Sequence, residues 1–399
     1  MKDLARSLSC RSESSDPAHL LYTCETQSTA PTELQPQALP FDVLHAVFLS
    51  ALDSADSVKE RQQLCLNIAL LSSDWTPFAL RQLYNSQLTF RMKRFSSKKK
   101  RFSRFYRSVT RQGRLASAVT WLKVDLKLAK ERLTALLASC EALQYLGLLD
   151  GETHISHLHA ASGIKTLYLD NVELNVASSS FFRPADPLVA LPLCFPRLSQ
   201  LIISTTWFTT PAIGKLLTPT VLPSLKNLTT AGVFSWSEPA LRDALLTLSP
   251  VLTSLTVLDP LRWTRHALLR CAPSLVHLRI SELPKNGSSL RHLLPFLNAS
   301  PFPLQTLTIH AQKIARRPST PDTLAVLARG LILGLTERRT SLEGLQKLTL
   351  SGPGWTTEQI KESVDLLKSV CGMREVEAAV EKEEEDVREE WVERAMERV

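Results

Sequence analysis

One spacing of apolar residues recurs along this chain and constrains its fold more than any other feature. Leu275, Leu278 and Ile280 are spaced L-x-x-L-x-L within the stretch PSLVHLRISEL. Seven further stretches repeat the whole spacing, from residues 119, 143, 164, 198, 252, 304 and 345, and one at residue 225 repeats its first half. Successive starts lie 21 to 41 residues apart. A repeat built of one strand and one helix needs roughly 20 to 29 residues, so the longer intervals predict insertions.

The spacing has a simple physical meaning in a β-strand, where alternate side chains point to opposite faces. The fourth and sixth positions of each repeat then face a core that is shared with the neighbouring repeats, and no single unit can bury its apolar side alone. The third and fifth positions face the other side of the sheet. Met373 and Val376 give a weaker tenth repeat. The chain is therefore predicted to stack parallel strands over most of its length.

These repeats resemble the leucine-rich repeat family, which implies an α/β solenoid of horseshoe shape over residues 118–380. The family often binds proteins on its concave face, and the third and fifth strand positions would line that face. Exposed Trp and Tyr are frequent anchors of protein interfaces. The predicted partner-binding residues are Trp121, Lys123, Tyr145, Tyr168, His277, Arg279, His310 and Lys347.

The chain changes character before the repeats. Residues 1–37 are rich in Ser, Thr, Gln and Pro, which predicts disorder. Residues 38–92 carry apolar stripes at helical spacing, beginning with Val43, Leu44, Val47 and Phe48, and they predict a small all-α module.

The stretches LPFDVLHAVF and LLSSDW within that module resemble an F-box, a three-helix motif. The resemblance implies docking on the Skp adaptor of a cullin-RING ubiquitin ligase. It assigns the adaptor contact to Leu39, Pro40, Val43, Leu44, Val47, Phe48 and Trp75. The alternative is that these helices only cap the first repeat, since solenoids need sealed ends.

The positive charge of the chain is concentrated between the module and the repeats. Residues 91–114 hold eleven Lys or Arg and no acid, with aromatic residues between them, which is typical of nucleic-acid binding. However, Phe102, Phe105, Tyr106 and Val109 lie at i, i+3, i+4 and i+7, which favours the buried stripe of an amphipathic helix with its basic side in water. We therefore expect a basic helix or linker over residues 93–117. A nuclear-import signal and nucleic-acid contact stay open as alternatives.

The sequence contains no recognisable catalytic constellation, so we expect no enzyme, cofactor or metal. His154, His157 and His159 are the best metal candidates, with only Glu152 nearby as a further ligand. The acidic residues 381–399 predict a solvated helix or tail. No apolar stretch reaches the length of a membrane span, and a cytoplasmic or nuclear location without membrane contact is expected. The predicted function is a substrate receptor of an Skp-cullin-F-box type ubiquitin ligase with an unknown target protein. The alternative is a repeat scaffold with no ligase role.

Overall fold

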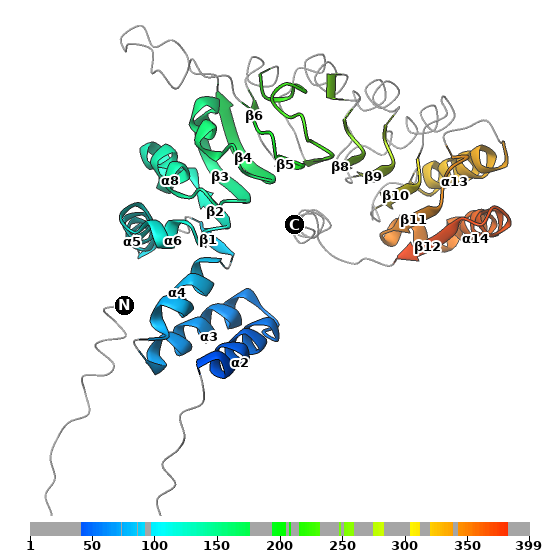
Figure 1. Cartoon of the computed structure of the whole chain (residues 1–399). Coiled ribbons are helices and arrows are strands. Elements are labelled where there is room, and N and C mark those ends of the chain that lie inside the picture. Colours follow the sequence, from blue (N-terminus) through cyan, green and yellow to red (C-terminus); the bar gives the residue numbers. More distant parts are fainter. Residues whose placement is uncertain are drawn as a thin grey trace, which may run out of the picture. The chain divides into compact units, whose positions relative to one another are not determined.

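The structure is a computed structural model of the chain, shown in Figure 1. It describes residues 41–72, 74–85, 87–91, 97–175, 194–204, 207–208, 215–231, 247–248, 251–258, 274–282, 304–311, 320–337 and 342–381. The predicted disordered segment 1–37, Leu39, Pro40 and residues 382–399 lie outside these ranges. The chain divides into two compact units, residues 1–51 and 52–399.

Three helices occupy the range predicted for the helical module. They are α2 (Phe41–Asp53), α3 (Val58–Leu71) and α4 (Thr76–Asn85). The side chain of Ser57 caps α3 by accepting a hydrogen bond from the backbone N–H of Glu60. The hydroxyl of Thr76 donates to the backbone oxygen of Ala69 over 3.1 Å, so it ties the start of α4 to the end of α3.

The described strands form one open sheet of 12 strands, in which each described repeat adds one strand (Figure 1). Along the path of the sheet they are β1 (Leu88–Phe90), β2 (Trp121–Asp125), β3 (Tyr145–His154), β4 (Thr166–Asn175), β5 (Gln200–Ser204), β7 (Asn227–Ala231), β8 (Ser254–Leu258), β9 (His277–Glu282), β10 (Thr306–Ala311), β11 (Lys347–Ser351) and β12 (Glu377–Glu381). The short β6 (Trp207–Phe208) pairs with β4 off this path. Every pairing is parallel.

The register confirms the predicted alignment of the nine main repeats. Position three forms one continuous row of Cα partners from Trp121 in β2 to Lys347 in β11. Positions four and six lie in the core, as Leu278 and Ile280 illustrate with exposed fractions of 1% and 2%. Because one residue of slip would turn every apolar side chain to the other face, this alternation sets the register.

Two strands differ from the prediction. β1 was not expected, and it extends the sheet by pairing Leu88 with Leu122 and Phe90 with Val124. The tenth repeat was misaligned: Met373 ends a helix and is 73% exposed, and the strand begins later, at Glu377. The apolar pair was misleading because Met373 and Val376 flank a turn whose Glu375 has a φ of 58°.

Helical segments connect the strands and complete the core on one side of the sheet. They are α5 (Ser97–Arg111), α6 (Gly113–Ala116), α7 (Leu126–Ala129), η1 (Lys130–Arg132), α8 (Leu133–Ser139), η2 (Ile155–Ala161), α13 (Thr320–Thr336), η5 (Pro353–Thr356) and α14 (Glu358–Met373). Figure 1 shows α8, α13 and α14 on the same side of the sheet. One continuous apolar core runs from Phe102 to Val376.

Helix α5 confirms the amphipathic interpretation of the basic segment. Phe102, Phe105 and Val109 are buried in the core, and Phe105 stacks on Tyr84 with ring centroids 5.9 Å apart. The cations of the helix whose side chains are described, such as Arg104, are exposed. Burial of the aromatic stripe therefore orients the basic side of the helix toward solvent.

None of the helices in the described ranges has both the length and the apolar character that crossing a bilayer requires.

Candidate binding surface

The side chains at positions three and five point away from the core, and we call this side of the sheet the non-core face. It is the face that the sequence analysis predicted as concave. The parallel pairing places each of these side chains beside its counterpart on the next strand, about 4.8 Å away. Rows of like positions therefore run across the sheet, and their composition decides what the face can bind.

On the first strands, β2 to β4, both rows contain aromatic residues. The rings of Trp121 and Tyr145, which are Cα partners, stack with centroids 4.4 Å apart and planes 3° apart. In the position-five row, Lys123 lies across Gly147 and places its Nζ 4.7 Å from the ring centroid of Tyr168. A side chain at Gly147 would obstruct this path, because a Cβ there would lie 2.9 Å from Cγ of Lys123. Stacking and the cation–π contact together make an ordered patch.

The structure corrects the prediction that these aromatic residues are exposed anchors. Tyr145 is 0% and Tyr168 4% exposed, and they form a second small apolar cluster with Leu149 and Ile202. Burial raises the pKa of Tyr145, and the charges of Tyr168 and Asp170 raise it further. Neighbouring strands are so close that large rings at adjacent positions cover one another. Trp121 and Lys123 remain half-buried, so they are the members of the patch that a partner could reach.

Beyond Ile202 of β5 the non-core face becomes polar, and it is hollowed there. A cavity of about 540 Å³ is lined mainly by small hydroxyl and amide side chains, among them Asn227, Thr229, Thr256 and Thr308. Short polar side chains keep the floor low and present hydrogen-bonding groups along its length. This part of the surface is suited to a polar partner segment.

Three predicted partner-binding residues, His277, Arg279 and Lys347, line this hollow. Nδ1 of exposed His277 lies 2.8 Å from Oγ1 of Thr306 on the next strand. Arg279 is half-buried. Lys347 donates to Glu377 over 2.6 Å, and this contact raises the pKa of Lys347. Lys347 therefore presents an ion pair to the hollow and not a single positive charge.

His310 was also predicted on this face, and the structure contradicts that placement. Its side chain is fully buried, with Nδ1 3.1 Å from Oγ of Ser351. Burial and the positive charge of Arg279 lower the pKa of His310 to about 4. The reason is its position: His310 lies two residues beyond position five, where the loop that holds Gly352 and buried Trp355 packs against the end of β10. The indole Nε1 of Trp355 donates to the backbone oxygen of Ile309 over 3.1 Å, so this buried tryptophan acts in packing.

The residues predicted to contact an adaptor differ in their accessibility. Val43 and Val47 on α2 are 44% and 53% exposed, and Leu44 and Phe48 are half-buried. Trp75 is only 7% exposed, and its ring meets that of Phe78 edge to face at 5.8 Å, so it acts in packing. Leu39 and Pro40 are outside the described residues.

Helix α3 carries exposed apolar residues that the sequence analysis did not assign to any surface. Leu66, Leu70 and Leu71 are 45%, 70% and 67% exposed. Ile68 of the same helix is buried, with an exposed fraction of 1%. Apolar residues occur all around this part of α3, and only one side of a helix can face the core. The sequence could therefore have indicated that some of these leucines are exposed.

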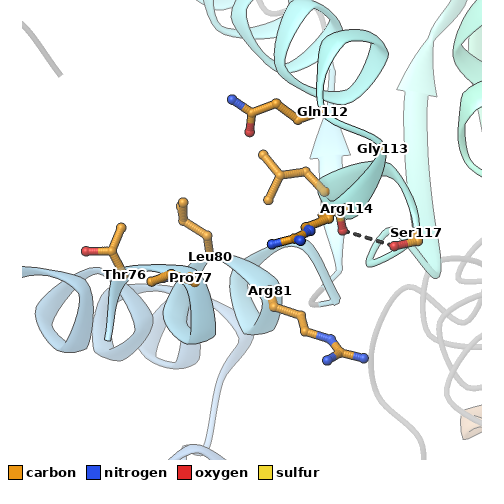
Figure 2. A pocket seen from close by; sticks show the side chains of 9 residues that line it. Thr76, Pro77, Leu80, Arg81, Gln112, Gly113, Arg114 and Ser117 are labelled. Carbon is orange, nitrogen blue, oxygen red and sulfur yellow. Dashed lines mark hydrogen bonds between the residues drawn. The ribbon is translucent and has the colours of Figure 1, made fainter. Parts of the chain in front are cut away.

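A pocket of about 890 Å³ lies between α4 and the turn from α5 into α6, and no sequence pattern indicated it (Figure 2). Its apolar lining is Pro77, Leu80 and Leu115, and its charged lining is Arg81 and Arg114. Thr76, Gln112, Gly113 and Ser117 complete the lining. Residues far apart in the sequence meet here, which explains why no local motif predicts the pocket.

Within the described ranges, no group of three His, Cys, Asp or Glu side chains is arranged to hold a metal ion. The rings of His154 and His157 meet edge to face at 5.5 Å, and Nδ1 of His157 lies 3.3 Å from Oγ1 of Thr153. These contacts account for two members of the histidine cluster.

Comparison with known proteins leaves the family of this chain open. No family model matches the sequence, and no curated protein matches it. Among solved structures, the chain is similar to the crystal structure of the mouse RP105/MD-1 complex, with 15% sequence identity and a TM-score of 0.27. The match covers 66% of this chain and 39% of that chain. A likeness at this level carries no argument about function.

Proposed function

We propose that this protein is a non-catalytic interaction receptor of the leucine-rich repeat type, and that the hollow on its non-core face holds a target protein. The observation that carries the proposal is the set of polar side chains that line the hollow of about 540 Å³, in which like positions of neighbouring strands lie side by side. Parallel rows of hydroxyl, amide and charged groups can bind an extended polar segment through many separate hydrogen bonds. Trp121 and Lys123 at one end of the same face would add a larger contact.

We further propose that the N-terminal helices dock on an Skp-type adaptor, which would make the protein the substrate-recognition subunit of a cullin-RING ubiquitin ligase. The exposed Val43 and Val47 on α2 support this role, because an isolated exposed apolar pair on a helix is suited to an apolar groove. The exposed leucines of α3 offer further contact area. The receptor would carry out no bond chemistry and would act by bringing the target close to the ligase. Such a role belongs in the cytoplasm or the nucleus.

The test is titration calorimetry of the full chain with purified Skp adaptor. Binding at micromolar or lower Kd is expected, and Val47→Asp should weaken it at least about tenfold because a carboxylate would be placed in an apolar contact. The matched control is Val326→Asp on α13, since Val326 has a similar exposed fraction of 43%. Equal weakening by both variants would point to a general loss of structure, which a thermal melt of each variant resolves.

Absence of adaptor binding by the folded full chain would remove the ligase role. The alternative is then a repeat scaffold whose front helices act as a cap. The buried Trp75 favours that role, because a ring committed to packing within the helices serves stability alone. The proposal for the non-core face does not depend on this outcome.

A further inference from the structure

The exposed side of α5 carries a straight row of cations, which we call the α5 row. Its four members follow one another at i, i+4, i+7 and i+11, and all are exposed: Lys100, Arg104, Arg107 and Arg111. Residues at this spacing lie above one another on a helix, so the row forms a single stripe about 16 Å long. Burial of Phe102, Phe105 and Val109 fixes the opposite stripe in the core. The α5 row therefore points to solvent along its whole length.

The positive charge of the α5 row is not offset by acidic residues. Helix α5 itself contains no Asp or Glu. Within the described ranges, no member of the row forms an ion pair with a carboxylate. Nε of Arg107 donates to the backbone oxygen of Ser103 over 3.2 Å, and that contact leaves the positive charge of the guanidinium in place. Four like charges on one stripe repel one another, and an anionic partner would relieve that repulsion.

The pocket between α4 and α6 begins where the α5 row ends. Arg111 is the last residue of α5, and the next residue, Gln112, lines the pocket. Figure 2 shows the side chains of Leu80 and Arg114 directed into the space between the two helices. Leu80 and Leu115 are half-buried, and the lining contains no acidic residue. The pocket thus offers room for an apolar side chain beside a further exposed cation, Arg114.

We propose that the α5 row and this pocket together bind an acidic helix of a partner protein. A partner helix beside α5 has the same rise per residue, so carboxylates at i, i+4, i+7 and i+11 would lie opposite successive cations. Guanidinium groups suit carboxylates because they can donate two parallel hydrogen bonds. A large apolar side chain one turn beyond the carboxylates would enter the pocket. None of the residues involved is among those assigned to the adaptor or to the hollow, so this is a separate partner site.

Nucleic acid and an anionic membrane are the other polyanions that a row of cations can attract, and the structure disfavours both. Phe102 and Phe105 are buried in the core, so they cannot stack on bases or enter a bilayer. Neither a phosphate backbone nor a layer of lipid headgroups has an apolar group to place between Leu80 and Leu115. An acidic peptide supplies both the charge and the apolar side chain that the site accommodates.

The experiment measures fluorescence anisotropy of labelled synthetic peptides added to the full-length protein. The test peptide is an alanine-based helix of about twenty residues, with glutamates at i, i+4, i+7 and i+11 and a leucine one turn beyond each end of that set. Leucine at both ends allows either direction of binding. Two matched peptides carry glutamine in place of every glutamate, or serine in place of both leucines.

The wild type is compared with a row variant, Arg107→Glu/Arg111→Glu, and a pocket variant, Arg114→Glu. The matched control, Lys165→Glu/Lys226→Glu, makes the same change of net charge as the row variant at two exposed lysines in the turns before β4 and β7. The test peptide is expected to bind wild type with a Kd of about 100 μM or lower. Its affinity should fall at least about tenfold in the row variant and about threefold in the pocket variant, and stay unchanged in the lysine control. Wild type should bind the glutamine peptide at least about tenfold, and the serine peptide at least about threefold, more weakly than the test peptide.

Equal affinity of wild type for the test and glutamine peptides would overturn the proposal, as would equal affinity of the row variant and the lysine control for the test peptide. A serine peptide that binds as tightly as the test peptide would remove the pocket from the site, with the same consequence. So would the absence of binding at test-peptide concentrations up to about 1 mM. A DNA duplex or phosphatidylserine vesicles that bind wild type but not the row variant, while the test peptide does not bind, would assign the row to that polyanion. All exchanged side chains are exposed, and a thermal melt checks that each protein is folded. No adaptor is present in this assay, so its result is independent of the proposed ligase role.

Discussion

Two adjacent residues of β9 test the assignment of faces on which the binding surface depends. Leu278 lies at position four and is 1% exposed, between its Cα partners Leu255 and Leu307 on the neighbouring strands. His277 lies at position three and is exposed. We predict that Leu278→Asp is severely destabilising and that His277→Ala is nearly neutral.

The two magnitudes differ because of what each side chain touches. Truncation of a buried leucine to alanine costs about 2–5 kcal/mol. A carboxylate at position 278 adds the cost of burying an unpaired charge, or of protonating it, so the total should exceed about 4 kcal/mol. Loss of the 2.8 Å contact between His277 and Thr306 at an exposed site should cost at most about 1 kcal/mol. Whole proteins of this kind are stable by about 5–15 kcal/mol, so the first change threatens the fold.

Urea denaturation followed by circular dichroism measures the difference. Leu278→Asp should lower the urea midpoint strongly or unfold several repeats, since each repeat is stabilised mainly by its neighbours. Leu278→Ala is the intermediate variant that stays measurable if the aspartate variant does not fold. Similar midpoints for His277→Ala and Leu278→Ala would refute the assignment of strand faces.

Three further predictions concern the buried corner beyond β10. Gly352→Ala should destabilise by about 1–3 kcal/mol in denaturant titration, because Gly352 has a φ of 94° and a Cβ there would lie 2.5 Å from the backbone oxygen of Ala311; a neutral effect would contradict this geometry. The pKa of His310 is lowered from 6.5 to about 4, so the folded state binds a proton at this ring less readily than the unfolded state does. The free energy of unfolding should therefore reach its full value above about pH 6.5 and fall by about 3 kcal/mol as the pH drops to 4. His310→Gln should flatten that part of the pH profile, and an unchanged profile would show that other groups cause the loss. Trp355→Phe should lower stability by about 1–3 kcal/mol, because the backbone oxygen of Ile309 loses its buried donor, whereas an unaltered midpoint would mean that water replaces the indole.

The sequence was sufficient to predict the strands of the nine main repeats because their signal is local and periodic. Alternation within L-x-x-L-x-L sets both the direction of each side chain and the register with the next strand. The same reasoning placed Phe102, Phe105 and Val109 in the core and the basic residues of α5 in water. It failed at Met373 and Val376, where two apolar residues flank a helix end and a turn.

Exposure on the non-core face could not be predicted in the same way. Tyr145 and Tyr168 were expected to be accessible, yet adjacent strands bring large rings together until they bury one another. Lys347 looked like an available cation until β12 supplied Glu377. In each case the decisive neighbour lies on another strand, at a separation of tens of residues in the sequence.

The sequence by itself determined the repeat, the parallel order of the strands and the division of side chains between core and non-core face, because each depends on a short-range period. Only the tertiary structure decided which of those side chains are reachable, where the sheet is hollowed, and that Leu80 and Leu115 line one pocket. Pockets and burial depend on contacts between segments that are distant in the chain. The spacing of residues within one segment carries no record of those contacts.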